Sequence, residues 1–432
     1  MYLSGKLLKW AKRCFNSVSP AINADGSTVI ARALHIISRD AISPNALRVL
    51  YKLKDAGYAA FLVGGGVRDI LLKRKPKDFD VATDAHPEAI RSLFRNSRII
   101  GRRFRLAHVF FGTEIIEVST FRANTAEETR TEETDMLMIH RDNTFGTIEE
   151  DAWRRDFTVN ALYYNIADFS IVDYMNGVND LKNRLIRIIG DPTQRYHEDP
   201  VRMLRAIRFA AKLDFALEKE TESALRSLTH LLRHVPPSRL FDECLKLFFE
   251  GNAQVTYQKL LQYDYMQVLF PQTNIILQKN KNKTHEKLIQ LAMNSTDVRL
   301  KENHSVNPAF LLAILLWPVL QVKIAQMKEK KVKFYFQLHQ FIHNIMQMQL
   351  KSIMIPKRFQ YAIQTIWVMQ FQLEKRRKSR ILVILHHRYF RAAFDFMGLR
   401  VQAGEMSSQI FDWWKEFQFS DEAAQIKMIE KL

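Results

Sequence analysis

The sequence predicts an α+β protein in which a small N-terminal α/β head precedes an all-helical neck and body. Short β-like runs alternate with helical ones from about residue 40 to residue 190, whereas nearly every later segment has helical periodicity. Within the head, the apolar run 58–63 ends in three glycines before a short predicted helix (67–72), and the runs 109–111 and 115–120 flank the turn Gly112-Thr113-Glu114. We therefore expect a sheet with a local hairpin in the head and helix-on-helix packing after it.

These patterns divide the chain into four predicted segments: a basic arm (1–39), the head (40–190), a helical neck (191–255) and a helical body with a basic C-terminal region (256–432). Residues 1–24 contain no acidic side chain and interleave leucines with lysines. A floppy basic arm is expected there, with weak membrane-surface contact or an organelle transit peptide as alternatives. Segment 123–138 is rich in glutamate and is expected to be a mobile acidic loop, with no role assigned.

Composition excludes several classes of protein. The 432 residues include only 2 Cys, too few for a disulfide framework or a cysteine zinc site, which fits a reducing compartment. The longest apolar run, residues 309–320, is shorter than the roughly 20 residues that span a bilayer, so a soluble, cytoplasmic protein is expected. The net charge of +18 predicts a polyanionic partner, and nucleic acid is favoured over an anionic membrane.

The strongest local motif is the stretch Phe61-Leu-Val-Gly-Gly-Gly-Val-Arg-Asp69. Glycines that follow a strand allow a tight turn and present backbone N–H groups to phosphate oxygens, and Arg68 adds a cation. The motif is not a dinucleotide-binding fingerprint, because Asp69 stands where the third glycine should be. It is not a P-loop either, because the Gly-Lys-Ser/Thr ending is missing.

Asp78 and Asp80 follow shortly after the glycines, two residues apart in a segment of strand character. Both carboxylates should therefore project from one face, with their Cα atoms about 6 to 7 Å apart. Two carboxylates held together suit Mg²⁺, which binds through protein carboxylates and substrate phosphates. The alternative is a solvated Asp-x-Asp turn, which the glycine-rich turn upstream disfavours.

Glycines 64–66 with Arg68, followed by Asp78-Phe-Asp80, resemble the catalytic core of the class II nucleotidyltransferases, the family of bacterial poly(A) polymerases and tRNA CCA-adding enzymes. Two more segments agree: Arg154-Arg-Asp-Phe-Thr-Val-Asn-Ala161 resembles the family's R-R-D-[FL]-T-x-N-[AS] motif, and Glu198-Asp-Pro-Val-Arg202 resembles its E-D-x-x-R motif. The resemblance covers about residues 41–213. It implies a nucleotidyltransferase head of the polymerase β type, with the neck serving base recognition and RNA contact.

The resemblance also implies roles for individual residues. Asp78, Asp80 and Asp156 would be catalytic, and Glu117 is an additional candidate carboxylate, ranked below Asp156 because it lies outside the matched motifs. Asp199 and Arg202 would recognise the base edge. ATP would be held by Gly65, Arg68, Arg155, Arg205 and Arg208. Two alternatives stay open: a buried Arg–Asp pair that only braces the head, and an i,i+3 salt bridge on a solvated neck helix.

The segment Ile99–Val109 and the basic C-terminal region are typical of the poly(A) polymerase branch. Residues 355–400 hold ten Lys/Arg and two acids. The RNA-binding residues are predicted to be Arg102, Arg103, Arg105, Lys375, Arg376, Arg377 and Lys378.

Together these features predict a monomeric enzyme that uses two Mg²⁺ ions to add AMP from ATP to RNA 3′ ends. The alternatives are a tRNA CCA-adding enzyme and a non-catalytic RNA-binding protein on the same scaffold.

Overall fold

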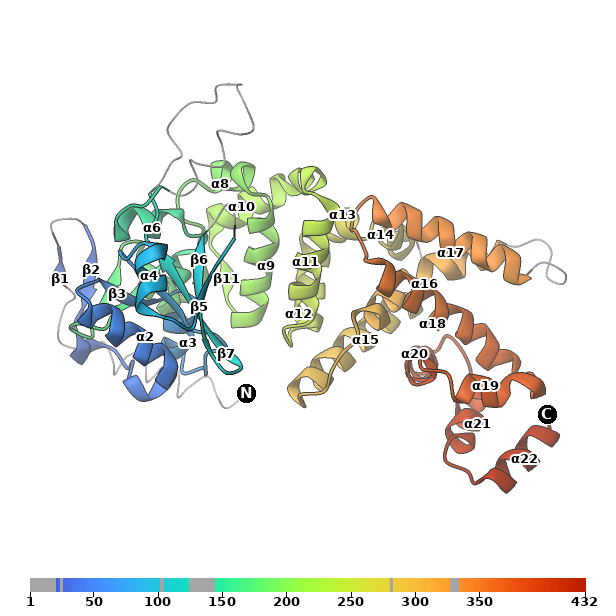
Figure 1. The fold of residues 1–432 in the computed structure, drawn as a ribbon. Coiled ribbons are helices and arrows are strands. Elements are labelled where there is room, and N and C mark those ends of the chain that lie inside the picture. Colours follow the sequence, from blue (N-terminus) through green and yellow to red (C-terminus); the bar gives the residue numbers. More distant parts are fainter. Residues whose placement is uncertain (1–20, 24–25, 102–104, 124–143, 280–282, 327–333) are drawn as a thin grey trace. The chain divides into compact units, whose positions relative to one another are not determined.

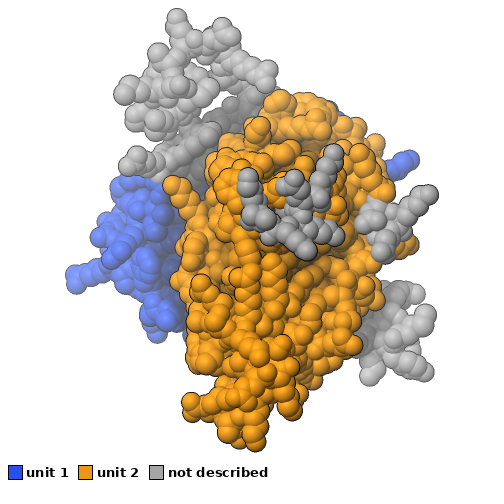
Figure 2. Space-filling model, turned by 90° about the vertical axis from the view of Figure 1, so that its right-hand side faces the viewer, with its two compact units in different colours: residues 1–195, 215–222 blue, residues 196–214, 223–432 orange. Residues whose placement is uncertain are grey.

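The computed structural model describes residues 21–23, 26–101, 105–123, 144–279, 283–326 and 334–432. The chain forms two compact units, coloured separately in Figure 2: residues 1–195 with 215–222 form unit 1, and residues 196–214 with 223–432 form unit 2. The predicted α+β class is confirmed, because the sheet lies in unit 1 and unit 2 is helical. The division does not follow the expected boundaries at 190/191 and 255/256. Residues 215–222 rejoin the head because β11 (Ala216–Leu217) pairs in parallel with β10 (Leu185–Ile186).

Unit 1 is built on a nine-stranded sheet with the order β1-β2-β9-β8-β3-β4-β7-β6-β5. Every neighbouring pair is antiparallel except β4 and β7, which are parallel. The strands are β1 (Ala21–Ile22), β2 (Thr28–Ile30), β3 (Ala60–Val63), β4 (Asp80–Thr83), β5 (Ser97–Ile100), β6 (Leu106–Phe111), β7 (Glu114–Thr120), β8 (Leu162–Asn165) and β9 (Ile171–Asp173). The predicted hairpin corresponds to β6 and β7, and the sheet places β3 beside β4 at its centre (Figure 1).

Helices connect and cover these strands. They are η1 (Arg32–Leu34), η2 (Arg39–Ala41), α2 (Pro44–Asp55), α3 (Gly65–Leu71), α4 (Pro87–Leu93), α6 (Ile148–Arg154), η3 (Thr158–Asn160), α7 (Gly177–Asn183) and α8 (Pro192–Glu198). Helix α2 begins where the Ser43 hydroxyl accepts a hydrogen bond from the Ala46 N–H, and its buried residues recur at helical spacing. Helix α6 begins with a capping box between Thr147 and Glu150.

Part of the predicted basic arm belongs to the sheet. Strands β1 and β2 pair with each other, and β2 pairs with β9 over Thr28–Asp173, Val29–Val172 and Ile30–Ile171. The expectation of a floppy arm therefore does not hold for this stretch, because these residues complete one edge of the sheet. Residues 1–20 lie outside the described residues, as does nearly all of the acidic segment 123–138.

Unit 2 consists of helices and short 3-10 turns. They are α9 (Val201–Leu213), α10 (Lys219–Ser227, begun in unit 1), η4 (Thr229–His234), α11 (Pro237–Phe248), α12 (Ala253–Gln262), α13 (Met266–Leu269), α14 (Pro271–Lys279), α15 (Thr284–Lys301), α16 (Pro308–Ala325), α17 (Phe334–Leu350), α18 (Lys357–Lys375), η5 (Lys378–Arg380), α19 (Ile381–Leu385), α20 (Phe390–Ala403), α21 (Gln409–Phe417) and α22 (Glu422–Glu430). Buried tryptophans tie this unit together. The Trp367 indole donates to the Ala313 carbonyl at 2.9 Å, and the Trp414 indole to that of Leu373 at 3.0 Å.

Helix α16 contains the apolar run 309–320 and extends to 18 residues, longer than the run itself. Within the described residues it is one helix whose length and composition would allow it to cross a membrane, and 61% of it is buried inside the protein. Trp317 on this helix is fully buried and donates to the Glu405 carboxylate at 3.1 Å. Such burial is what the core helix of a helical unit requires.

Candidate active site

A row of register partners crosses the centre of the sheet in unit 1. Going from β8 to β6, the partners are Tyr163, Val63, Asp80, Glu117 and His108. Residues directly opposite one another in a sheet point to the same face, so the two carboxylates share a face with the tyrosine and the histidine. The His108 Nε2 atom lies 3.4 Å from a Glu117 carboxylate oxygen. The strand pairing thus concentrates polar side chains in one line.

The paired aspartates lie where β4 begins. Asp78 is exposed two residues before the strand, and Asp80 is its half-buried first residue. Burial raises the pKa of Asp80 to about 6; repulsion from Glu117 and Asp78 adds to the rise, and attraction by Arg155 opposes it. A carboxylate in this environment is stabilised by a cation.

The glycine turn connects β3 to α3 and lies against the aspartates. Gly64 has φ +67°, a conformation that side chains larger than hydrogen rarely adopt, and a Cβ atom there would lie 3.2 Å from Arg155 Nη1. A Cβ on Gly66 would lie 3.7 Å from the Asp78 carbonyl oxygen. The glycines therefore allow Arg155 and the aspartate segment to approach the turn closely. The helix begins at Gly65, two residues before the start predicted at residue 67.

Arg68 is only 3% exposed and is held from two sides. Its guanidinium lies 2.7 Å from the Asp69 carboxylate and donates to the side-chain oxygen of Asn160. The position predicted to supply a cation for phosphate therefore also braces the turn between α3 and η3. Asn160 and Asp69 belong to the quoted motifs, but the sequence did not indicate that they bind this arginine.

Arg155 has a similar set of partners. It donates to the Tyr163 hydroxyl at 2.8 Å, to the Asn160 carbonyl at 3.3 Å and to Asp151 at 3.1 Å. Burial alone would lower the pKa of Arg155, but attraction by Tyr163 and Asp151 outweighs it, so the pKa is raised and the charge is permanent. Tyr163 also donates to Asp151 at 2.7 Å. Sequence reasoning missed Asp151 and Tyr163, although the i,i+4 spacing of Asp151 and Arg155 was a usable signal.

Asp156 faces a different set of groups. It accepts hydrogen bonds from the Phe157 N–H at 2.8 Å and from the Asn160 amide at 3.1 Å. Glu117, in contrast, is the register partner of Asp80 and raises its pKa. Motif membership ranks Asp156 above Glu117, whereas the sheet register favours Glu117 as the carboxylate beside Asp80. The predicted bracing Arg–Asp pair does form, but between Arg155 and Asp151.

The donor set fits a magnesium ion that shares its ligands with a substrate. Within the described ranges, no three His, Cys, Asp or Glu side chains group closely enough to hold a metal by themselves. Asp78 and Asp80 provide two carboxylates at one edge of β4, and Mg²⁺ is commonly held by one or two carboxylates together with phosphate oxygens and water.

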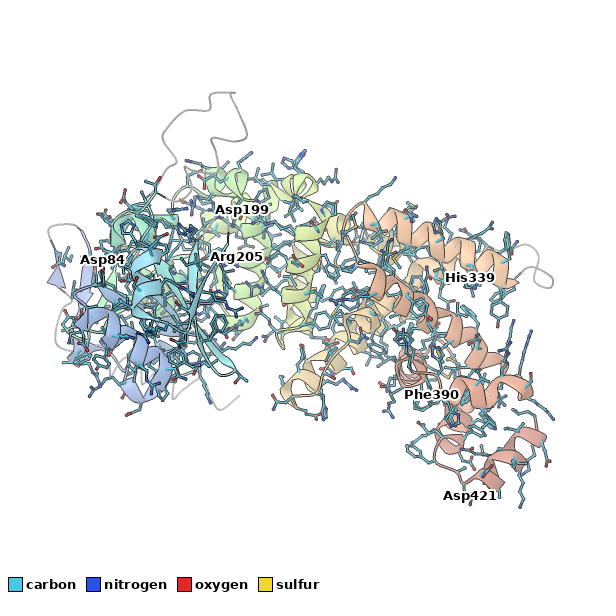
Figure 3. The ribbon with its side chains drawn as sticks, viewed as in Figure 1. Asp84, Asp199, Arg205, His339, Phe390 and Asp421 are labelled. Carbon is cyan, nitrogen blue, oxygen red and sulfur yellow. The ribbon has the colours of Figure 1, made fainter. Side chains whose placement is uncertain are left out.

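The predicted base-reading residues lie in unit 2, next to and on α9; Figure 3 labels Asp199 and Arg205. Asp199 pairs with Arg239 at 2.7 Å, and Arg202 pairs with Glu198 at 2.8 Å. Each of the two residues thus has an ion-pair partner outside the expected Asp199–Arg202 pair. These partners hold the two side chains in defined orientations.

The other two arginines of α9 differ in their surroundings. The Arg205 guanidinium lies 5.5 Å from the centroid of the Phe209 ring. Arg208 is 8% exposed and forms an ion pair with Glu250 at 2.6 Å. The helix wheel placed Arg208 on the half available to a ligand, whereas the structure buries it, because Glu250 compensates its charge.

The predicted RNA contacts fall in both units. Arg102 and Arg103 lie outside the described residues, and Arg105 forms a salt bridge with Glu88 at 2.7 Å. In unit 2, Lys375, Arg377 and Lys378 are exposed. The Lys375 ammonium lies 4.6 Å from the Phe334 ring centroid, the Arg376 guanidinium 5.4 Å from that of Trp413, and Lys378 donates to the Glu430 carbonyl at 2.8 Å.

Three family profiles match this chain. Residues 60–187 match the Poly A polymerase head domain, residues 214–277 the probable RNA and SrmB-binding site of polymerase A, and residues 330–432 the polymerase A arginine-rich C-terminus. Poly(A) polymerase I of Salmonella typhi is 46% identical over 414 residues, which cover 94% of this chain and 89% of the relative. A CCA-adding enzyme of Lactobacillus helveticus is 39% identical over 50% of this chain and 52% of its own.

The fold also occurs in solved structures. A structure described as "tRNA-processing enzyme (apo form I)" superposes with a TM-score of 0.62 at 21% identity, covering 92% of this chain and 99% of its own. The fold and the paired aspartates define a class II nucleotidyltransferase. Within that class, this chain belongs to the bacterial poly(A) polymerase family, as the identity along nearly its whole length shows.

Proposed function

We propose that this protein is a polynucleotide adenylyltransferase that adds AMP from ATP to RNA 3′ ends without a template and releases pyrophosphate. The observation that carries the proposal is the extent of the identity. The match to a poly(A) polymerase runs through 94% of the chain, whereas the match to a CCA-adding enzyme covers half of it. Nearly all of the chain, rather than the head alone, therefore resembles a poly(A) polymerase.

Asp78 and Asp80 would hold two Mg²⁺ ions. Bound there, the ions would lower the pKa of the primer 3′-hydroxyl and neutralise charge on the triphosphate. Arg155, fixed by Tyr163 and Asp151, directs a permanent positive charge toward Asp80 and the adjoining phosphate position. Catalysis then consists mainly of positioning and electrostatic stabilisation.

Residues of the head would hold the phosphates of ATP. Gly65 offers backbone N–H at the turn, Arg155 supplies charge, and Arg68 keeps the turn in place through its bonds to Asp69 and Asn160. Asp156 assists by fixing Asn160.

Residues of the neck would recognise the base. Asp199 and Arg202 would hydrogen-bond to the adenine edge, supported by Arg205 and Arg208.

RNA would follow exposed cations. Arg102, Arg103 and Arg105 would contact the primer, and Lys375, Arg376, Arg377 and Lys378 would contact its phosphates further from the end. Replacing the four C-terminal residues together by glutamine should raise the KM for RNA, leave that for ATP unchanged, and flatten the dependence of log K on log salt by roughly 0.7 for each phosphate released. A monomeric, cytoplasmic enzyme with at most weak membrane-surface contact fits this role.

The decisive experiment supplies Mg²⁺, an oligoribonucleotide and each nucleoside triphosphate separately. The proposal requires long extension with ATP and little with CTP, GTP or UTP. Extension of tRNA by CTP and then ATP, stopping after the CCA end, would identify the CCA-adding alternative instead. RNA binding without incorporation of any nucleotide would identify the non-catalytic alternative.

A further inference from the structure

Unit 2 contains a cavity of about 620 Å³ that is separate from the residues discussed so far. Its walls come from α15, from residues 305–307 before α16, from the start of α20 and from α21. Helix α20, which carries the labelled Phe390 in Figure 3, packs on both α15 and α21. The volume lies in the range of pockets that hold small ligands, which is about 300–1,000 Å³. We refer to it as the α15–α20 pocket.

Positive charge exceeds negative charge in the pocket wall. Arg299, Arg388 and Arg391 line it together with one acid, Asp395. The Asp395 carboxylate is 3.0 Å from Arg391 Nε and 4.0 Å from Arg299 Nη1, so it offsets part of their charge. Arg388 donates to the Tyr389 hydroxyl at 3.0 Å and lies over the ring of the same residue. Three guanidinium groups and one carboxylate leave a wall suited to an anion.

Two helix N-termini add to this potential. Residues 388–392 lie at the start of the 14-residue helix α20, and Asn307 is the N-cap of the 18-residue helix α16. The N-terminal end of a helix carries a partial positive charge and favours phosphate.

Aromatic rings supply a second kind of surface. Phe411 lines the pocket and stacks on Phe394 with ring centroids 4.6 Å apart at an interplanar angle of 13°. A Cβ atom on Gly398 would lie 2.9 Å from the Phe411 ring, so the glycine gives the ring room to lie against α20. Tyr389 provides a further aromatic wall. Flat rings next to arginines suit a stacked nucleobase with its phosphate.

We propose that the α15–α20 pocket holds one nucleotide of single-stranded RNA away from the reacting 3′ end. Its phosphate would lie against Arg388 and Arg391, and its base against the aromatic wall. The proposal rests on the proposed function in taking RNA as the substrate. An acidic peptide would use the arginines but not the stacked aromatic wall, which is why a nucleotide is the favoured occupant. The pocket would anchor the strand, so that longer primers bind more tightly than short ones.

The test measures equilibrium binding of a fluorescent 20-nucleotide oligo(A) by anisotropy over a range of salt, which does not depend on catalysis. Arg388→Gln with Arg391→Gln should weaken binding about tenfold and reduce the salt slope by roughly 0.7 for each phosphate that is no longer bound. Ala392→Trp should also weaken binding, because it fills the pocket without changing charge. Lys427→Gln, which removes an exposed charge on α22, should change the affinity little. Unchanged melting temperatures establish that the variants fold.

Competition separates the sources of the ligand. AMP at millimolar concentration should not displace oligo(A), whereas unlabelled oligo(A) should. The pocket proposal is overturned if folded pocket variants bind oligo(A) like the wild type, or if only free AMP or a poly-glutamate peptide responds to the substitutions. A wild-type protein that binds oligo(A) through the pocket but adds no AMP would overturn the proposed function and leave the pocket proposal standing.

Discussion

Asp80 and Glu117 are direct register partners across β4 and β7, the one parallel pair in the nine-stranded sheet of the described chain. Neighbouring strands are about 4.8 Å apart, so the backbone itself holds these two carboxylates on one face. Like charges in directly opposed positions destabilise a sheet. The arrangement therefore has an electrostatic cost in the protein alone, and a divalent cation with the triphosphate offsets it.

The first prediction concerns activity. Asp78→Asn or Asp80→Asn should reduce AMP addition by more than about a hundredfold, since each change removes a carboxylate proposed to hold the ions that stabilise the transition state. Oligo(A) affinity, measured by anisotropy, should stay close to that of the wild type because the primer is held elsewhere. Near-normal activity of Asp80→Asn would remove the two-metal mechanism.

The Asp80 substitution should have the opposite effect on stability. The pKa of Asp80 is raised to about 6 in the folded protein. A raised pKa contributes stability below the unfolded value, near 3.9, and this contribution is lost as the pH rises through about 6. At pH 7.5 without metal, Asp80→Asn should therefore stabilise the protein by on the order of 1 kcal/mol, allowing for the solvent that reaches this carboxylate. Urea unfolding in EDTA checks the sign, and a lower midpoint for the variant would contradict it.

Glu117→Gln tests whether the register pair acts electrostatically. Removing this charge should lower the pKa of Asp80, because repulsion from Glu117 is the largest contribution to the rise after burial. NMR titration of the Asp80 carboxyl carbon in metal-free protein measures the change. Glu114→Gln, on the same strand and bonded to Asn45, is the matched control and should leave the Asp80 titration in place. Equal titration curves in all three proteins would show that burial alone sets the value.

Motif reasoning located the site but not the partners that hold it. The glycine turn and the aspartates could be predicted because their chemistry is local in the sequence. Asp151 and Tyr163 could not, since the value of each depends on Arg155, which reaches Tyr163 only after β8 pairs with β3. Strands β1 and β2 escaped for a similar reason: so short a strand carries little periodicity, and the pairing of β2 with β9 is long-range.

Two glycines separate backbone strain from crowding. Gly64→Ala should lower both stability and AMP addition, because the new Cβ would lie 3.2 Å from Arg155 Nη1 at a φ of +67°. Gly112→Ala, in the hairpin turn at φ +63° with nothing within 4 Å, carries only the backbone strain of about 1–2 kcal/mol. Melting temperatures should fall in both variants, whereas kcat should fall only in the first. Equal losses of kcat would show that Arg155 is not disturbed by the turn.

The last prediction concerns the choice of nucleotide. Asp199→Ala or Arg202→Ala should reduce the preference for ATP over CTP and UTP more than it reduces total turnover, because a missing hydrogen-bonding partner is worth about 1–3 kcal/mol of discrimination. Arg239→Gln should produce a smaller loss of the same kind, since it leaves the Asp199 carboxylate in place but releases it from its 2.7 Å ion pair. Asp242→Ala, an exposed acid on α11, is the control for charge and should leave the preference unchanged. The ratios of kcat/KM for ATP, CTP and UTP measure the effect. If ATP preference survives at Asp199 and Arg202 alike, the base is recognised by other residues, and the ion pairs with Arg239 and Glu198 serve only to brace the neck.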